Sequence, residues 1–204
     1  MKIGIVNYSI GNIGSVHSAL SFFGLDVSFV QTPHELENVD VIVLAGVGNF
    51  ITAVGRLKVL KMWSKIDKEV TVKKKPVIGI CLGMQLFADL SYEGGRTKGF
   101  GWIKGEVVKM EGENLIIPHT GWNRVNTSGK GIFNGIQNSY FYFMHSYHFI
   151  PENKKVICGA TDYGDLKIVS AVRKDNIIGV QFHPEKSQSG GLRLLKNIIE
   201  EINC

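Results

Sequence analysis

Residues 76–85 read PVIGICLGMQ, and this stretch decides the fold. The β-branched residues at its start predict a buried strand, and residues 82–88 predict a helix that begins immediately afterwards. Cys81 therefore falls at the corner between strand and helix, with Gly79 and Gly83 on either side. Such a sharp corner needs small neighbours, and the N-terminus of a helix favours a thiolate over a thiol. The pattern indicates a nucleophile; a buried structural cysteine is the alternative.

A second motif lies far downstream, where a predicted strand at residues 176–182 runs into His183, Pro184 and Glu185. A thiol nucleophile needs a base that takes its proton and later returns it to the leaving group. That base in turn needs a carboxylate to orient it. Because His183 and Glu185 are two residues apart at a strand end, both side chains can lie on one face. Taken alone, the motif also fits a solvated turn; together with Cys81 it predicts a catalytic triad.

The two motifs, GICLGMQ at residues 79–85 and QFHPE at residues 181–185, resemble the signatures of class I, or triad-type, glutamine amidotransferases. Within that family the resemblance points to the glutaminase subunits of imidazole glycerol phosphate synthases, which serve histidine biosynthesis. The stretches that carry this narrower resemblance are residues 7–12, 46–50, 118–123, 145–147 and 183–187.

The chain departs from the family pattern outside the triad. Asn7 and Ser9 stand where the family usually has Asp and Gly, Ala45 replaces a proline, and Thr120 replaces a methionine. These departures keep open a paralogous glutaminase that feeds ammonia to a different synthase, such as one forming an amidine on a surface sugar. Two further alternatives are a γ-glutamyl or other cysteine hydrolase and a binding module without activity. The intact triad argues against the last of these.

The remaining pattern predicts an α/β fold in one domain, residues 1–204, with a mixed, mostly parallel sheet and helices on both faces. The resemblance implies the same flavodoxin-like, three-layer arrangement. Strands and helices alternate in the first half, which favours parallel strands joined by crossover helices. The expected strands there are 2–7, 26–30 and 39–44, and the expected helices are 13–23 and 51–73.

Short strands replace this alternation in the second half. They read as antiparallel hairpins, and a final helix at residues 191–202 closes the domain. In such sheets the active site lies at the carboxyl ends of the strands, where Cys81 and His183 both fall. The expected strands are 102–110, 140–144, 147–150, 156–161, 168–172 and 177–182.

Composition limits the function classes. The 204 residues are 44% hydrophobic, which suffices for a full core, yet no apolar run reaches the length of a membrane span. The N-terminus starts directly as a strand, and an odd number of cysteines (Cys81, Cys158 and Cys204) makes a disulfide framework unexpected, so we expect a cytoplasmic protein without membrane association.

Neither nucleic acid nor metal is expected as a partner. The net charge of +5 comes from scattered basic residues, and the lysine run at residues 73–75 reads as a solvated helix end. His145 and His148 point to opposite faces of an apparent strand, so they do not form a zinc pattern. We expect no cofactor.

Two glycine-rich segments follow predicted strands. The first, at residues 11–15, lacks the G-x-G-x-x-G spacing of a dinucleotide site. The second, at residues 46–48, can expose backbone N–H groups as a nest for negative charge. We expect the N–H of Val47 or Gly48 as one oxyanion donor and that of Leu82 as the other, with an ordinary tight turn as the alternative. By resemblance, the second segment flips to complete the site when a partner binds.

The resemblance also implies the substrate, L-glutamine, and the residues that hold it. Gln85 would lie near the α-amino and carboxylate groups of glutamine, and Ser146 and Tyr147 would add backbone contacts. Spacing supports Gln85, because a residue four positions after the nucleophile lies on the same helix face.

The implied reaction is glutamine hydrolysis through a cysteine thioester, with ammonia passed to a cyclase subunit of the HisF type. That partner is a (β/α)₈ barrel in a heterodimer with the glutaminase. Ammonia there joins a phosphoribulosyl-formimino carboxamide ribotide and gives imidazole glycerol phosphate and an aminoimidazole carboxamide ribotide. The segment 118–123 reads as a proline- and glycine-broken loop that carries a large aromatic. The expected interface residues are Asn12, Pro118, His119, Trp122, Tyr142 and Lys186.

Overall fold

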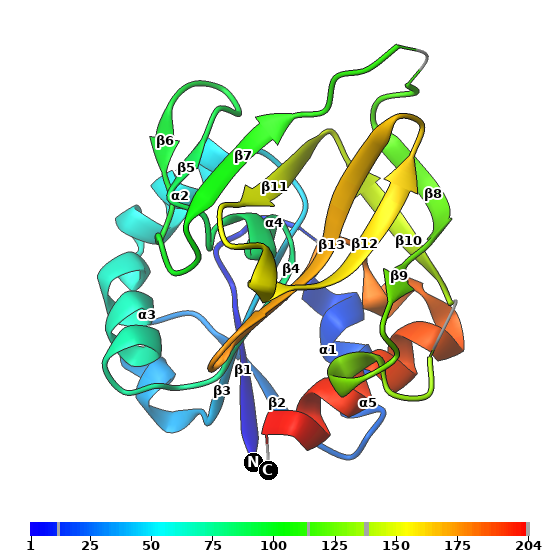
Figure 1. Ribbon diagram of the computed structural model, residues 1–204. Helices are drawn as coiled ribbons and strands as arrows, with labels where there is room; N and C mark the ends of the chain where they lie inside the picture. Colours follow the sequence, from blue (N-terminus) through cyan, green and yellow to red (C-terminus); the bar gives the residue numbers. More distant parts are fainter. Residues whose placement is uncertain (12, 114, 137–138, 203–204) are drawn as a thin grey trace.

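A mixed sheet forms the centre of the computed structural model, which describes residues 1–11, 13–113, 115–136 and 139–202 (Figure 1). Within those residues it has eight strands in the order β2-β1-β3-β4-β14-β13-β12-β9. Strands β2, β1, β3, β4 and β14 run parallel, and the remaining three are antiparallel. Their bounds are β1 Lys2–Val6, β2 Asp26–Val30, β3 Val41–Gly46, β4 Val77–Cys81, β9 Asn126–Thr127, β12 Ile157–Tyr163, β13 Leu166–Lys174 and β14 Ile177–Val180.

Helices cover both faces of this sheet (Figure 1). Because side chains alternate along a strand, Ile42 and Leu44 of β3 pack into the core under α2 and α3, whereas Val41 and Val43 pack into the core under α1 and α5. A parallel sheet buried on both faces reads as a continuous apolar run, as residues 41–45 do. The helices are α1 Ile13–Ser21, α2 Phe50–Val59, α3 Met62–Thr71, α4 Leu82–Gln85 and α5 Gln188–Ile202.

In the part of the chain that the structure describes, two smaller sheets stand beside the carboxyl ends of the central strands (Figure 1). One has the order β11-β7-β5-β6, and the other pairs β10 with β8. Their bounds are β5 Leu90–Ser91, β6 Thr97–Lys98, β7 Gly105–Lys109, β8 His119–Arg124, β10 Tyr140–His145 and β11 Tyr147–Pro151; the short 3₁₀ helices are Glu35–Asn38, Gly131–Phe133, Lys154–Val156 and Pro184–Lys186. Among the described residues, no helix combines the length and apolar character needed to cross a membrane.

The predicted fold class is confirmed, while two predicted helices differ. The helix expected at 51–73 is split into α2 and α3, because Lys61 adopts a left-handed φ of 57° between them. The helix after the corner ends at Gln85 instead of Ala88. Its continuation tightens into three-residue turns, with the Ala88 N–H donating to the Gln85 carbonyl, as the ring of Phe87 packs inward against Gly79.

Two further predictions in the second half were wrong. The strands at 140–144 and 147–150 do not form a hairpin, since β10 pairs with β8 and β11 pairs with β7. The segment 118–123, expected as a loop, is largely strand β8, in which Trp122 lies opposite Tyr142 of β10. Pairing with β10 holds this segment as a strand, although its proline and glycine are typical of a loop.

Candidate active site

Cys81 sits at the corner where β4 passes into α4, as the sequence predicts. Its backbone has φ 54° and ψ −110°, a strained conformation that residues with side chains rarely adopt. The flanking glycines permit it. A Cβ on Gly83 would collide with the carbonyl oxygen of Leu44, and one on Gly79 would collide with the ring of Phe87. The corner therefore holds the sulfur at the carboxyl end of the sheet.

The turn after β14 places an imidazole–carboxylate pair beside this corner, because β14 is the neighbour of β4 in the sheet. His183 Nδ1 lies 2.8 Å from Glu185 Oε1, and both side chains are buried. The Ser187 hydroxyl donates to the His183 carbonyl and accepts from the Tyr142 N–H, which fixes the turn. With Nδ1–H donating to the carboxylate, Nε2 keeps its lone pair. Among the described residues this buried nitrogen has no hydrogen-bond partner, so its lone pair is available to take a proton.

Electrostatics couple this pair to the sulfur. Burial lowers the pKa of His183, but the charge on Cys81 and the Glu185 carboxylate outweigh burial and hold that pKa above its usual range. This shift agrees with the pairing of β14 with β4, which brings the imidazole beside the corner. The imidazole is therefore placed to exchange a proton with the thiol.

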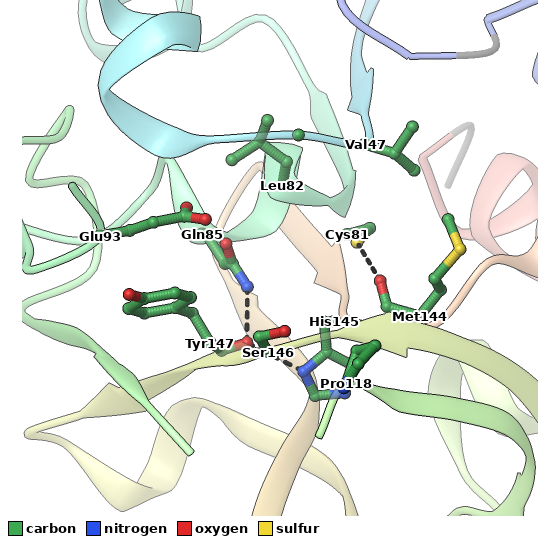
Figure 2. Close-up of a pocket in the computed structure, with 11 residues that line it drawn as sticks. Val47, Cys81, Leu82, Gln85, Glu93, Pro118, Met144, His145, Ser146 and Tyr147 are labelled. Atoms are coloured by element: carbon green, nitrogen blue, oxygen red, sulfur yellow. Dashed lines mark hydrogen bonds between the residues drawn. The ribbon is translucent and has the colours of Figure 1, made fainter. Parts of the chain in front are cut away.

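Cys81 opens onto a pocket of about 270 Å³ (Figure 2). Pockets for drug-sized ligands typically span roughly 300–1,000 Å³, so this one suits a small substrate. It brings the predicted oxyanion and substrate residues together with the sulfur. The lining residues are Val47, Gly48, Cys81, Leu82, Gln85, Glu93, Pro118, Met144, His145, Ser146 and Tyr147.

Polar groups face this pocket opposite the sulfur (Figure 2). Gln85 Nε2 donates to the Tyr147 carbonyl at 2.9 Å. Glu93 accepts from the Phe50 N–H at 2.8 Å, and burial raises the pKa of Glu93 while that hydrogen bond opposes the shift. Sequence reasoning missed Glu93, because it lies in a short turn without a motif and reaches the pocket only through the fold.

Three buried histidines lie near the site, and burial lowers the pKa of each. The pKa falls to about 3 for His145 and to about 4 for His119, and it is also lowered for His148. His145 Nδ1 donates to the Tyr147 carbonyl at 2.9 Å, so its Nε2 accepts from His119 Nδ1 at 3.0 Å. Across the described ranges, no three His, Cys, Asp or Glu side chains are grouped to hold a metal ion.

The family model of class-I glutamine amidotransferases matches residues 5–202. The chain belongs to this family. The relatives include proteins named imidazole glycerol phosphate synthase subunit HisH. The one from Pelagibacter ubique is 43% identical over 207 residues, covering 98% of this chain and 99% of the relative. The one from Pyrococcus furiosus is 44% identical over 198 residues, covering 96% and 97%.

Solved structures share the fold of this amidotransferase. A glutamine amidotransferase crystal structure superposes with a TM-score of 0.77 at 17% identity and covers 99% of both chains. The structure of PurLQS from Thermotoga maritima gives a TM-score of 0.74 at 18% identity, covering 98% of this chain and 97% of that one. At such identities the likeness concerns the fold alone.

Of the residues expected at a partner interface, four are exposed or partly exposed on the surface of the amidotransferase, and His119 is buried. Trp122, Tyr142 and Lys186 form one surface patch: the two rings meet edge to face at 6.2 Å, and Lys186 Nζ lies 5.8 Å from the centre of the Tyr142 ring. Trp122 is 46% exposed. Pro118 is exposed at the rim of the pocket.

His119 does not belong to this surface, which corrects the prediction for it. It is 2% exposed, because its ring stacks on Phe143 and Tyr163 while its Nδ1 bonds to His145. The strand alternation of β8 turns it inward, away from Trp122. Asn12 lies outside the described residues.

Cys158 offers no second nucleophile. Burial raises the pKa of its thiol to about 12, against smaller opposing effects from its own backbone and from Arg173. It sits within β12, away from any corner. Cys204 lies outside the described residues.

Proposed function

We propose that the chain is the glutaminase subunit of an imidazole glycerol phosphate synthase. It hydrolyses L-glutamine to glutamate and ammonia and passes the ammonia to a cyclase subunit in histidine biosynthesis. The observation that carries this proposal is the strained Cys81 corner with the His183–Glu185 pair beside it, at the wall of a small pocket. The HisH names of relatives that match nearly the whole chain support the pathway.

The proposed reaction begins with proton transfer from the Cys81 thiol to His183 Nε2. The sulfur attacks the side-chain amide carbon of glutamine, and His183 returns the proton to the nitrogen, which leaves as ammonia. Water then attacks the glutamyl thioester, with His183 again acting as the base, and glutamate is released. Glu185 fixes the tautomer of His183 and stabilises the imidazolium.

The tetrahedral intermediates carry a negative oxygen that needs donors. We assign these donors to the backbone N–H of Val47 or Gly48 and to that of Leu82, whose residues line the pocket with the sulfur. Each such donor contributes roughly a hundred- to a thousandfold in rate.

The opposite end of the pocket suits the α-amino and carboxylate groups of the substrate. Glu93 supplies a carboxylate for the ammonium, and Gln85 lines the same side of the pocket, opposite the sulfur (Figure 2). Ser146 and Tyr147 would contribute backbone contacts beside them. Glutamine would thus be held by its charged end, with its amide directed at Cys81.

The proposed partner is a HisF-type cyclase with a (β/α)₈ barrel. The exposed patch of Trp122, Tyr142 and Lys186 supports a docking surface, because aromatic and cationic residues often anchor interfaces. Pro118 lies exposed at the pocket rim. Docking there would lie next to the triad, since Lys186 follows Glu185 in the chain.

The experiment that tests the proposal is glutamate release from glutamine by the chain and its cyclase partner together. Wild type and Cys158→Ala should both hydrolyse glutamine, whereas Cys81→Ala should not. With ammonium salt supplied, the complex containing Cys81→Ala should still make the cyclase product. Glutamine hydrolysis by Cys81→Ala would overturn the assignment.

A further inference from the structure

A chain of buried amides ends on the sulfur of Cys81. Gln181 follows β14, two residues before His183, and its side chain is fully buried. Gln181 Nε2 lies 3.6 Å from Cys81 Sγ, within hydrogen-bond distance for sulfur. Its Oε1 lies 3.0 Å from Gln85 Nε2. Gln181 therefore connects the substrate side of the pocket to the reacting atom.

A backbone carbonyl fixes which end of the Gln181 amide faces the sulfur. The Tyr147 carbonyl can only accept, so the group 2.9 Å from it must be the NH₂ of Gln85. The second proton of that NH₂ points at Gln181, which must present its oxygen. The NH₂ of Gln181 is then left for Cys81. The hydrogen bonds of Gln85 therefore fix the orientation of the Gln181 amide, and the flipped amide would not satisfy them.

The Tyr147 carbonyl is itself held in place. His145 Nδ1 donates to it at 2.9 Å, and His119 Nδ1 donates to His145 Nε2 at 3.0 Å. Both rings are neutral near pH 7, because burial lowers the pKa of each. The hydrogen bonds from His119 to Cys81 thus each have a defined donor and acceptor.

The sulfur needs a donor once it loses its proton. As a thiol, Cys81 Sγ donates to the Met144 carbonyl at 3.8 Å. After the proton moves to His183, that carbonyl offers the thiolate no stabilisation, and Cys81 is only 4% exposed to water. Gln181 N–H faces the sulfur and can donate to its negative charge. Charge-assisted hydrogen bonds of this kind are stronger than neutral ones.

We propose that Gln181 is a further catalytic residue, whose amide N–H stabilises the Cys81 thiolate while Gln85 holds that amide in the donating orientation. This inference rests on the proposed role of Cys81 as the nucleophile. The proton of the thiol goes to His183, the sulfur keeps the electron pair, and the Gln181 protons stay on nitrogen. Tyr8 and His183 are titratable groups that also couple to the sulfur, and neither changes in the variants below.

The test is the pH profile of Cys81 alkylation by iodoacetamide without glutamine, followed by mass spectrometry of the Cys81 peptide. Gln181→Leu removes the donor and should move the midpoint up by about one to two pH units, with alkylation at pH 7 slower by roughly 10- to 100-fold. Gln181→Glu replaces the donor with a carboxylate and should move the midpoint further. Glutaminase kcat in the complex should fall by a similar factor, with a smaller change in KM.

Asn197→Leu is the matched control. Asn197 is a buried amide on α5 that donates to the Ile132 and Asn134 carbonyls at 3.0 and 2.8 Å. Its replacement should lower the melting temperature and leave the alkylation profile unchanged. If Gln181→Leu does not fold, Gln181→Met carries the same test with an unbranched side chain.

A folded Gln181→Leu or Gln181→Met with the wild-type alkylation profile would overturn the proposal. That result differs from failure of the proposed function, which would show as glutamine hydrolysis by Cys81→Ala. Because alkylation is measured without glutamine, it reports the effect of Gln181 on the Cys81 thiolate whether or not the chain hydrolyses glutamine.

Discussion

At the residue scale, the corner at Cys81 depends on two glycines that leave no room for a side chain. A Cβ on Gly83 would collide with the backbone carbonyl of Leu44, and backbone cannot move aside as a flexible side chain does. Gly83→Ala should therefore lower the free energy of unfolding by at least about 1–3 kcal/mol, measured by urea denaturation.

Gly55→Ala is the matched control for that change. Gly55 lies in α2, and an added Cβ would have no neighbour within 4 Å. Alanine there should stabilise the protein by roughly 0.5–1 kcal/mol, because glycine is a poor helix former. Equal effects of the two substitutions would show that the Cys81 corner is not tightly packed.

The base and its carboxylate should contribute unequally. His183→Ala should lower the glutaminase kcat of the complex on the order of 10⁴-fold, since members of a triad act as a unit. Glu185→Gln should lower it less, because the imidazole remains and only its orientation and charge stabilisation weaken. Steady-state kinetics with glutamine measures both. A larger loss for Glu185→Gln than for His183→Ala would contradict these roles.

Sequence alone could indicate the residues whose identity is dictated locally. Gly79 and Gly83 indicate a tight corner in which neighbouring atoms leave no room for a side chain. A histidine two residues before a glutamate indicates a base with a carboxylate that orients it. Gln181 carried no such signal, although it lies within the second motif. Its contact with the sulfur follows from the pairing of β14 with β4, in which Val180 lies opposite Ile80, and no local pattern encodes that pairing. Glu93 was missed for the same reason.

At the element scale, helix α3 carries a buried carboxylate held by lysines. Glu69 has no exposed side-chain surface, and its oxygens lie 3.0 Å from Lys65 Nζ, 2.8 Å from Lys73 Nζ and 3.2 Å from Lys75 Nζ. The lysine run at 73–75 was expected as a solvated helix end; two of its members instead pair with Glu69. Burial raises the pKa of Glu69, but the lysines outweigh burial and lower it to about 2.

Glu69→Gln should therefore destabilise the protein in a pH-dependent way. The folded pKa lies below the unfolded value of 4.5, so the stabilisation is fully present above pH 4.5 and is lost as pH falls toward 2. A shift of this size corresponds to about 3 kcal/mol at pH 7. Urea denaturation should show that difference between wild type and variant, and the difference should shrink below pH 4.5.

The exposed pair of Lys196 and Glu200, 3.6 Å apart, provides the control. Lys196→Gln should change the free energy of unfolding by less than about 1 kcal/mol, as surface pairs usually do. A difference for Glu69→Gln that stayed constant from pH 7 to pH 3 would contradict the ionic account.

Element boundaries were predicted well where periodicity was strong. The strands of the parallel half and α5 fall close to their predicted positions, and in β1, β3, β4 and α5 the apolar pattern reflects burial. The break at Lys61 had no glycine or proline to signal it. The pairing of β10 with β8 and of β11 with β7 could not be predicted, since the partner of a strand is set by the whole sheet.

At the scale of the whole molecule, the exposed patch should link docking to catalysis. Trp122→Ala should weaken the complex with the barrel partner by roughly 1–4 kcal/mol, measured by titration calorimetry. Lys186→Ala should uncouple glutamine hydrolysis from binding of the acceptor substrate. Phe29→Ala, an exposed aromatic on the edge strand β2, is the control and should leave the affinity unchanged.

We also expect the free subunit to be nearly idle, because ammonia released without an acceptor is wasted. Glutaminase rates with and without the barrel partner and its ligand measure this directly. A free subunit that runs at the full rate of the complex would show that docking does not switch the site on.

The most direct test of the central claim is the mass of the Cys81 peptide from the complex, acid-quenched while it turns over glutamine. A glutamyl increment is expected on this peptide and none on the Cys158 peptide, and the increment should accumulate further in variants that slow thioester hydrolysis. Steady glutamate release without any increment at Cys81, persisting in Cys81→Ala, would contradict this claim.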